Sequence, residues 1–167
     1  MGAYDNCIIL IPALQPDERL IQMIHGLHER GFHKIAVTDD GSSDDRQKYF
    51  QEVEIMGVKV IHHSKKMGKG VALRSALRLA DEKIGESDFY ITADCDGQYS
   101  PEDIEKVAKE LLENPDCFVL GVRTYERKKG KKVRFWLNLA RNYFSVLPIM
   151  EKNVRILEVD FVVFQLH

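Results

Sequence analysis

Five short segments of this chain are rich in apolar residues, and polar or amphipathic segments separate them; the first, Cys7 to Ile11, is continuously apolar. Short continuous apolar runs are typical of strands that are buried on both faces of a parallel sheet. We therefore predict five strands, which are Cys7 to Ile11, Ile35 to Val37, Val58 to Ile61, Phe89 to Ala93 and Phe118 to Val122.

The segments between these runs carry the apolar spacing of helices. Leu20, Ile21, Ile24 and Leu27 line one face of a helix that begins near residue 17, and Gly31 ends it. Three more helices are predicted, which cover about residues 45–55, a segment around residues 73–80, and about residues 100–113. The last of these begins with Ser at the N-cap and Pro at the first helical position.

Because strand and helix alternate five times, we predict an α/β fold with a mostly parallel sheet and helices on both faces. Right-handed crossovers favour the order 3-2-1-4 for the first four strands, with a reversal between strands 1 and 4. Ligands bind outside the carboxyl ends of the strands at such a reversal. Pro12, the Asp39-Asp40 turn and the pair Asp94 and Asp96 should therefore meet at one edge of the sheet.

Composition and charge indicate which partners and which cellular compartment to expect for the protein. A chain of 167 residues with a net charge of -2 suits one domain without a general attraction to nucleic acid, and we expect no nucleic-acid partner. The three cysteines lack metal-ligand spacing, which favours a reducing compartment. Asp5 stands where a signal peptide needs a cationic start, and no run reaches the roughly 18 to 20 apolar residues of a membrane span. We expect a cytoplasmic protein.

Two acids one residue apart, Asp94 and Asp96, follow the fourth predicted strand directly. Their carboxylates, with the side-chain oxygen of Gln98, are hard ligands of the kind that Mg²⁺ and Mn²⁺ share with the phosphates of a substrate. An acidic turn that caps the following helix is the alternative. Asp94 and Asp96 are our candidate catalytic residues, and Mg²⁺ or Mn²⁺ is the expected cofactor.

Two further polar turns carry candidate chemistry. Asp39-Asp40-Gly41-Ser42 follows the second strand, where an acid can accept hydrogen bonds from ribose or base; a simple helix-capping turn explains it equally well. Residues 65–70 hold glycines and lysines, including Lys69, before a helix, as in a phosphate cradle or a solvated basic turn. Arg123 follows the fifth strand and can reach a diphosphate, or it is an ordinary surface arginine.

Several other chemistries find little support. The six histidines are scattered, and His62-His63 has no third ligand at metal-site spacing. No serine elbow or Cys/His pair suggests a covalent nucleophile. A receiver-type phosphorylation domain would place acids after strand 1 and a phosphoacceptor Asp after strand 3, where this chain has Pro12 and His62-His63.

The C-terminal part has a different character. Residues 123–134 are strongly basic, and from Val133 to Leu147 apolar and aromatic residues follow helical spacing. Such a helix either lies on an anionic membrane surface or packs on the domain with a solvated face. Val159 to Phe164 is a short apolar, β-prone run. We expect an edge of the sheet to be exposed or to be covered by Val154 to Leu166, and we expect the tail to associate with a second copy, giving a homodimer.

Taken in order, four motifs of the chain resemble those of family 2 glycosyltransferases with the GT-A fold, most closely the dolichol- or polyprenyl-phosphate sugar transferases. The motifs are Val37-Thr-Asp-Asp-Gly-Ser42, Met67-Gly-Lys-Gly-Val-Ala-Leu-Arg74, Ala93-Asp-Cys-Asp-Gly-Gln98 with Ser100-Pro-Glu-Asp-Ile104, and Gly121-Val-Arg123. The resemblance implies a three-layer Rossmann-like GT-A domain, a nucleoside-diphosphate sugar as donor, and a polyprenyl phosphate as acceptor.

The resemblance also implies roles for single residues. The base and ribose would be held by Pro12, Val37 and Asp39. The metal would be held by Asp94, Asp96 and Gln98. Arg123 would contact the donor phosphates. The complete predicted nucleotide-binding set is Pro12, Ala13, Val37, Asp39, Asp40, Lys69, Asp94, Cys95, Asp96 and Arg123.

The chain also departs from the family pattern. Leu14-Gln15-Pro16 stands where the family often has Tyr-Asn-Glu, and Lys66 stands where Asn is expected. The family's later Asp-Thr-Gln-x-Gly-x-Arg stretch and acceptor segments are missing, as in a chain truncated at its C-terminus. We expect residues 1–125 to form the nucleotide-sugar-binding GT-A core, and residues 126–167 a basic amphipathic helix and apolar tail of the same domain.

Two functions follow from these patterns. The first is a metal-dependent, inverting glycosyltransferase that can lie peripherally at the inner face of a membrane. The second is a sugar-nucleotide-binding module without turnover, because the acceptor part is missing.

Overall fold

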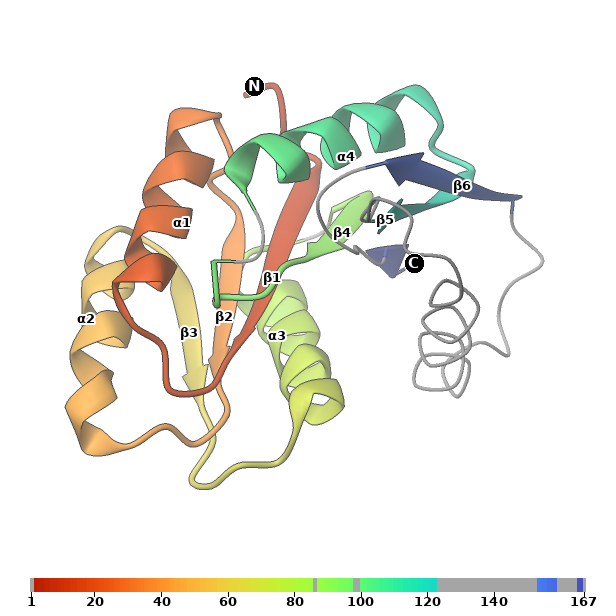
Figure 1. Cartoon of the computed structure of the whole chain (residues 1–167). Helices are drawn as coiled ribbons and strands as arrows, with labels where there is room; N and C mark the ends of the chain where they lie inside the picture. Colours follow the sequence, from red (N-terminus) through yellow and green to blue (C-terminus); the bar gives the residue numbers. More distant parts are fainter. Residues whose placement is uncertain (1, 86, 98–99, 123–152, 159–164, 167) are drawn as a thin grey trace, which may run out of the picture.

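The computed structural model describes residues 2–85, 87–97, 100–122, 153–158 and 165–166. Their main sheet has the strand order β3-β2-β1-β4-β7, in which β1 to β4 run parallel and β7 is antiparallel to β4 (Figure 1). The elements in chain order are β1 (Cys7–Ala13), α1 (Glu18–Glu29), β2 (Ile35–Asp39), the 3₁₀ turn η1 (Asp44–Arg46), α2 (Gln47–Ile55), β3 (Lys59–His62), α3 (Lys69–Lys83), β4 (Phe89–Thr92), α4 (Pro101–Glu113), β5 (Cys117–Val122), β6 (Asn153–Glu158) and β7 (Gln165–Leu166).

The order predicted for the first four strands, 3-2-1-4, is confirmed. The observed β1 continues through Pro12, which the sequence analysis placed outside the strand, and Pro12 lies opposite Thr38 in the ladder with β2. The ladder between β1 and β4 ends at Leu10, so Pro12 lies past the part of β1 that is paired on both sides, where a missing N–H is tolerated. The predicted second helix is divided into η1 and α2.

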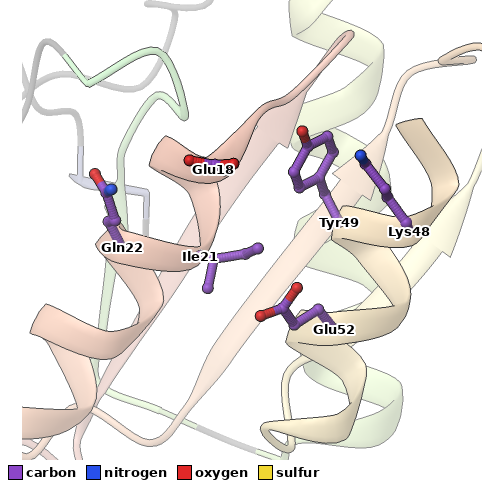
Figure 2. A pocket seen from close by; sticks show the side chains of 6 residues that line it. All are labelled: Glu18, Ile21, Gln22, Lys48, Tyr49 and Glu52. Atoms are coloured by element: carbon purple, nitrogen blue, oxygen red, sulfur yellow. The ribbon is translucent and has the colours of Figure 1, made fainter. Parts of the chain in front are cut away.

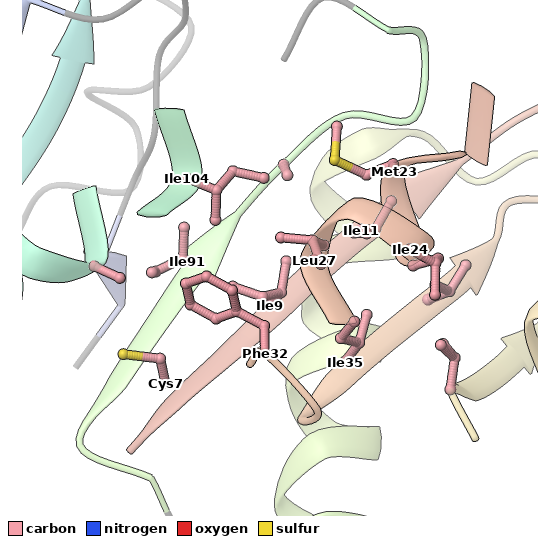
Figure 3. Close-up of a cluster of buried hydrophobic side chains, with 14 of the residues drawn as sticks. Cys7, Ile9, Ile11, Met23, Ile24, Leu27, Phe32, Ile35, Ile91 and Ile104 are labelled. Carbon is pink, nitrogen blue, oxygen red and sulfur yellow. The ribbon is translucent and has the colours of Figure 1, made fainter. Parts of the chain in front are cut away.

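The sheet is covered on both faces, so the domain has three layers. Side chains of a strand alternate between faces, and in β1 Ile9 and Ile11 pack in a large cluster with residues of α1, α2 and α4 (Figure 3). Ile8 and Leu10 point to the other face, where they pack with Ala76 and the rest of the small inner side of α3. Both clusters are fully buried around β1, which confirms the predicted α/β class.

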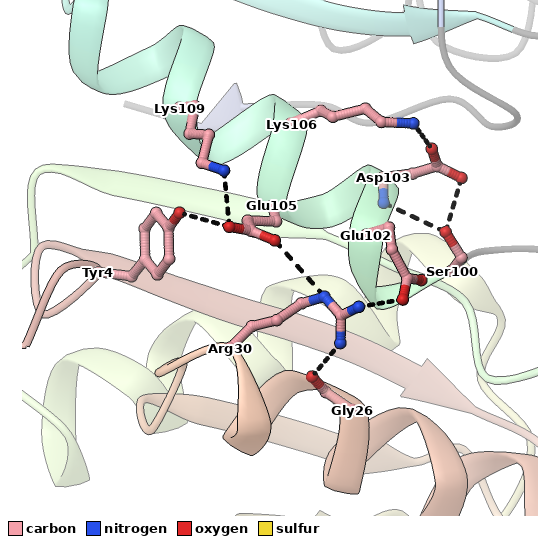
Figure 4. Close-up of polar contacts among 9 residues, drawn as sticks. All are labelled: Tyr4, Gly26, Arg30, Ser100, Glu102, Asp103, Glu105, Lys106 and Lys109. Atoms are coloured by element: carbon pink, nitrogen blue, oxygen red, sulfur yellow. Dashed lines mark hydrogen bonds and ion pairs between the residues drawn. The ribbon is translucent and has the colours of Figure 1, made fainter.

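Polar contacts connect the two helices that share one face of the sheet (Figure 4). Arg30, at the end of α1, forms ion pairs with Glu102 and, at 3.5 Å, with Glu105 of α4. Ser100 caps α4 by accepting the N–H of Asp103 at 3.2 Å, as the sequence predicts. Gly26 of α1 lies so close to α4 that a Cβ there would be 2.5 Å from Cγ of Pro101.

The fifth strand is not in the main sheet, contrary to the fivefold alternation that suggested a single sheet. β5 instead pairs in parallel with β6 in a separate two-stranded sheet. The free side of β4 pairs with β7, so part of the C-terminal segment covers the sheet edge, one of the two outcomes expected for it. The predicted amphipathic helix, the apolar run Val159 to Phe164, and Arg123 lie outside the described residues.

Within the described residues, no helix has both the length and the apolar character needed to cross a lipid bilayer.

Candidate active site at the carboxyl edge of the sheet

The carboxyl ends of the parallel strands bring the predicted polar turns together. The turns after β1 and β2 are joined by two hydrogen bonds, Asp40 N–H to the carbonyl of Ala13 at 2.8 Å and Gln15 N–H to Oγ of Ser42 at 2.9 Å. Lys69, the first residue of α3, reaches the end of β4, where its Nζ lies 2.7 Å from Oδ1 of Asp94. The edge therefore gathers segments that are far apart in the sequence, as the strand order predicts.

The Asp94-Cys95-Asp96 segment lies next to two cationic side chains. Lys69 contacts both carboxylate oxygens of Asp94, at 2.7 and 2.8 Å. Arg19, from the first turn of α1, donates to the backbone carbonyl of Asp96, and its side chain lies against Gly97. Burial raises the pKa of the Cys95 thiol to about 11, so Cys95 stays protonated at neutral pH and is a poor nucleophile.

Asp39, at the end of β2, is buried and accepts hydrogen bonds from three different segments. Its Oδ1 accepts the N–H of Ser42 at 2.7 Å, and its Oδ2 contacts Nε2 of Gln47 at 2.9 Å and Nδ1 of His62 at 3.0 Å. Burial raises the pKa of the Asp39 carboxyl, but these hydrogen bonds outweigh the burial, and the pKa is lowered from its ordinary value. Asp39 is therefore ionised at neutral pH.

Asp40 is directed toward the turn that precedes α3. Its carboxylate accepts the N–H groups of Met67 and Gly68, each at 2.8 Å, and contacts Nδ1 of His63 at 3.0 Å. Burial raises the pKa of the Asp40 carboxyl, but the hydrogen bonds from His63, Met67 and Gly68 outweigh it and lower the pKa. Both oxygens of Asp40 therefore contact the turn before α3 or His63.

The remaining predicted site residues are placed less uniformly. Pro12 is partly exposed and Ala13 is buried at the end of β1, beside the site. Val37 is fully buried in the core between β1 and β3, so its side chain is not brought to the edge. Gln98 and Arg123 lie outside the described residues.

The sequence analysis missed the residues that support the two acids after β2. His62 and His63 pair with Asp39 and Asp40, and Gln47 and Arg19 also contact the edge. The signal was present, because consecutive acids follow the second predicted strand and consecutive histidines follow the third. The parallel register places Asp39 opposite His62, so their side chains come into contact.

A pocket of about 380 Å³ lies away from these residues, between α1 and α2 (Figure 2). It is lined by side chains of mixed charge from both helices, which are Glu18, Ile21, Gln22, Lys48, Tyr49 and Glu52. None of the predicted site residues lines this pocket. The candidate site is therefore the carboxyl edge and not this groove.

The donor atoms at this edge show whether the site fits a divalent metal ion. Asp94 and Asp96 supply hard carboxylate oxygens, and a cation, the Lys69 ammonium, already lies against both oxygens of Asp94. The described residues contain no group of three or more His, Cys, Asp or Glu that could hold a metal. These donors fit a Mg²⁺ or Mn²⁺ ion that is shared with a ligand's oxygens rather than one held by the protein alone.

Comparisons with known proteins agree with this architecture. Among curated relatives, the chain is 28% identical over 139 residues to the UDP-N-acetylglucosamine--dolichyl-phosphate N-acetylglucosaminyltransferase of Methanococcus voltae, a match that covers 75% of this chain and 55% of that protein. It is 28% identical over 134 residues to the glycosyltransferase AglJ of Haloferax volcanii, covering 80% and 41%. The chain thus spans about half the length of these curated relatives.

Solved structures share the fold at low identity. Glucosyl-3-phosphoglycerate synthase from Mycobacterium tuberculosis, solved with Mn²⁺, UDP and glucosyl-3-phosphoglycerate, matches with a TM-score of 0.59 at 18% identity, covering 88% of this chain and 55% of that chain. Staphylococcus aureus TarS, residues 1–349, matches with a TM-score of 0.54 at 18% identity, covering 75% and 38%. The fold is that of the Rossmann-like GT-A glycosyltransferases. The family model described as glycosyl transferase family 2 matches residues 8–163, and the chain belongs to that family.

Proposed function

We propose that the carboxyl edge binds a nucleoside-diphosphate sugar and that the protein transfers the sugar to an acceptor oxygen. The observation that carries this proposal is the contact of Lys69 with both oxygens of Asp94, two residues before Asp96 and just past the end of β4, in a member of this family. Carboxylates and a lysine side by side suit a diphosphate that arrives with a divalent cation. The Mycobacterium tuberculosis neighbour, which contains Mn²⁺ and UDP, supports the same ligand class.

The residues of this chain have separate parts in the proposed reaction. Asp94 and Asp96, with Gln98, would hold a Mg²⁺ or Mn²⁺ ion, which would supply Lewis-acid stabilisation to the diphosphate when bound. Lys69 places a second positive charge at the same position, and Arg123 is proposed to contact the donor phosphates. In this proposal the positive charges of Lys69 and Arg123 stabilise the negative charge that develops on the leaving diphosphate.

Asp39 is the proposed acceptor for ribose or base. Asp39 lies at the carboxyl end of β2, and an ionised carboxylate only accepts hydrogen bonds, as the donating hydroxyls of ribose or an N–H of the base require. Pro12 and Ala13 line the adjacent end of β1. The base therefore lies between the turns after β1 and β2 in this proposal.

The proposed acceptor is a polyprenyl phosphate, in keeping with the dolichyl-phosphate acceptor in the name of the Methanococcus voltae relative. An oxygen of the acceptor phosphate attacks the anomeric carbon and forms a new C–O bond. The bond from that carbon to the diphosphate breaks in line, the leaving nucleoside diphosphate keeps the electron pair, and the configuration inverts. The phosphate is already ionised at pH 7, so the step requires no general base.

Transfer to lipid is the direct test of this proposal. The protein is incubated with sugar-labelled UDP- and GDP-sugars, either Mn²⁺ or Mg²⁺, and a polyprenyl phosphate, and the solvent-extracted lipid is counted. We expect label in the lipid and its loss when the metal is chelated. Label that stays with the nucleotide, under all donors and both metals, refutes transfer.

One alternative is a module that binds the sugar nucleotide without turning it over. Donor binding together with no lipid product would support that alternative.

We further propose that the protein lies peripherally at the inner face of the membrane, through the basic segment after residue 122, and that it forms a homodimer through the apolar tail. Light scattering of the whole chain and of a chain ending at Pro148 tests the dimer, which only the whole chain should form.

A further inference from the structure

Asp40, predicted as a nucleotide contact, instead makes contacts that hold another part of the site. Both of its oxygens are used: Oδ1 accepts the N–H of Met67 and contacts His63, and Oδ2 accepts the N–H of Gly68. An aspartate that accepts two backbone N–H groups fixes the path of those two residues. Lys69 is the next residue, so its starting point is set by Asp40.

His63 connects the same carboxylate to α3. The ring is 12% exposed; its Nδ1 lies 3.0 Å from Asp40, and its Nε2 lies 2.8 Å from the hydroxyl of Ser75. With the proton on Nδ1, a neutral ring donates to Asp40 and accepts from Ser75, so both nitrogens are satisfied. We refer to Asp40, His63, Ser75 and the amides of Met67 and Gly68 as the Asp40 anchor.

Close backbone packing adds a second constraint on the same turn. A Cβ at Gly41 would lie 2.3 Å from the carbonyl carbon of Lys65 and 2.5 Å from the nitrogen of Lys66. The turn after β2 therefore touches the turn before α3 along its main chain. Nζ of Lys69 extends from this fixed turn to both oxygens of Asp94.

We propose that Asp40 and His63 are positioning residues, which hold the turn of residues 64–68 so that Lys69 faces Asp94 and the diphosphate of the donor. The inference rests on the proposed function, because it assigns the diphosphate to that place. It gives Asp40 an indirect part in binding, through Lys69. If Asp40 and His63 had only a structural role, replacing them would affect folding, and the effect on binding would not depend on whether Lys69 is present.

The test has one readout that needs no ligand. Hydrogen exchange is followed at the amides of Met67 and Gly68 in the parent chain, in His63→Ala and in His63→Asn. Loss of His63 should raise exchange at these two amides by about tenfold or more, because a hydrogen-bonded network loses a member. The amides of Ile9 and Ile11 in β1 should exchange as in the parent, which shows that the fold is intact. The amide nitrogen of Asn can replace Nδ1 as the donor to Asp40, so His63→Asn should restore much of the protection.

The second readout is a double-mutant cycle with UDP and GDP in Mn²⁺, using whichever binds the parent chain. His63→Ala should weaken binding about tenfold in the parent, but less than about twofold when Lys69 is already Met, because coupled residues are not additive. His63→Asn should recover most of the affinity.

Equal weakening by His63→Ala with and without Lys69 would overturn the positioning role, and so would unchanged exchange at Met67 and Gly68. If the parent chain bound neither nucleotide with any divalent metal, the proposed function would fail, while the exchange data would still decide whether the anchor holds the turn.

Discussion

Replacing Gly41 by alanine tests the close contact between the turn after β2 and the turn before α3. Gly41 has φ +78°, a left-handed conformation, and a Cβ there would lie 2.3 to 2.7 Å from three backbone atoms of Lys65 and Lys66. Backbone atoms cannot rotate away as the end of a flexible side chain does, so the turns must separate.

The magnitude has two parts. A non-glycine residue in the left-handed region costs about 1–2 kcal/mol, and forcing extra volume into a packed contact costs about 1–3 kcal/mol. Gly41→Ala should therefore lower the free energy of unfolding by about 2–5 kcal/mol, a large fraction of the roughly 5–15 kcal/mol typical of a domain. Gly31→Ala is the matched control, because Gly31 has φ +85° but no atom within 4 Å of a new Cβ. It should cost only the first part, about 1–2 kcal/mol.

Urea unfolding followed by far-ultraviolet circular dichroism measures both variants, with the midpoint and slope compared to the parent. The reasoning predicts a larger loss for Gly41→Ala, by about 1–3 kcal/mol. If the two variants lose the same free energy of unfolding, the two turns are not in backbone contact, and the placement of residues 65–69 is wrong.

Three further predictions follow from contacts already described. Gly26→Ala should destabilise the protein by about 1 kcal/mol in the same urea assay, because the clash with Pro101 (about 1–3 kcal/mol) exceeds the gain in helix propensity (about 1 kcal/mol); a stabilised variant would contradict the observed packing of α1 on α4. The pKa values of Asp39 and Asp40 are lowered in the folded protein, so their contribution to stability is present above the unfolded value of about 3.9 and is lost as the pH falls through the folded values. Urea midpoints should fall between pH 5 and pH 3 and should be flatter with pH in Asp39→Asn, whereas an equally steep fall in that variant would argue against this origin. Asp39→Ala should weaken nucleotide binding by about 1–3 kcal/mol with Mn²⁺ binding nearly unchanged, and equal nucleotide affinity would make the motif a plain turn.

The main sheet could be predicted from the sequence because each of its first four strands coincides with a short segment rich in apolar residues. Runs such as Cys7 to Ile11 must be buried on both faces, and only a central parallel strand provides that burial. Crossover handedness then left few strand orders, and the observed one was among them.

The partner of β5 could not be predicted in this way. The run Phe118 to Val122 shows that a strand exists, but an apolar run does not specify which neighbour it pairs with. In the structure β5 pairs with β6, more than thirty residues further along the chain. Long-range pairing of this kind depends on the packing of the whole chain.

The acids of the site were visible in the sequence, but the direction of each side chain was not. Asp39 and Asp40 are adjacent and chemically identical, yet they contact different segments, α2 and the turn before α3. That difference depends on the local backbone at the end of β2 and on two histidines supplied by the neighbouring strand. Sequence alone therefore identified the edge but not the anchor within it.

The central claim is that the carboxyl edge binds a nucleoside diphosphate together with a divalent cation held by Asp94 and Asp96. Isothermal titration of UDP and GDP, each with and without Mn²⁺, measures this directly in the parent chain, in Asp96→Ala and in Asp116→Ala, an exposed acid before β5 that serves as the control. We predict Mn²⁺-dependent binding of one nucleotide that Asp96→Ala weakens by more than about tenfold and that Asp116→Ala leaves unchanged. Binding that is equally tight in Asp96→Ala, or that does not depend on the metal, would contradict the account.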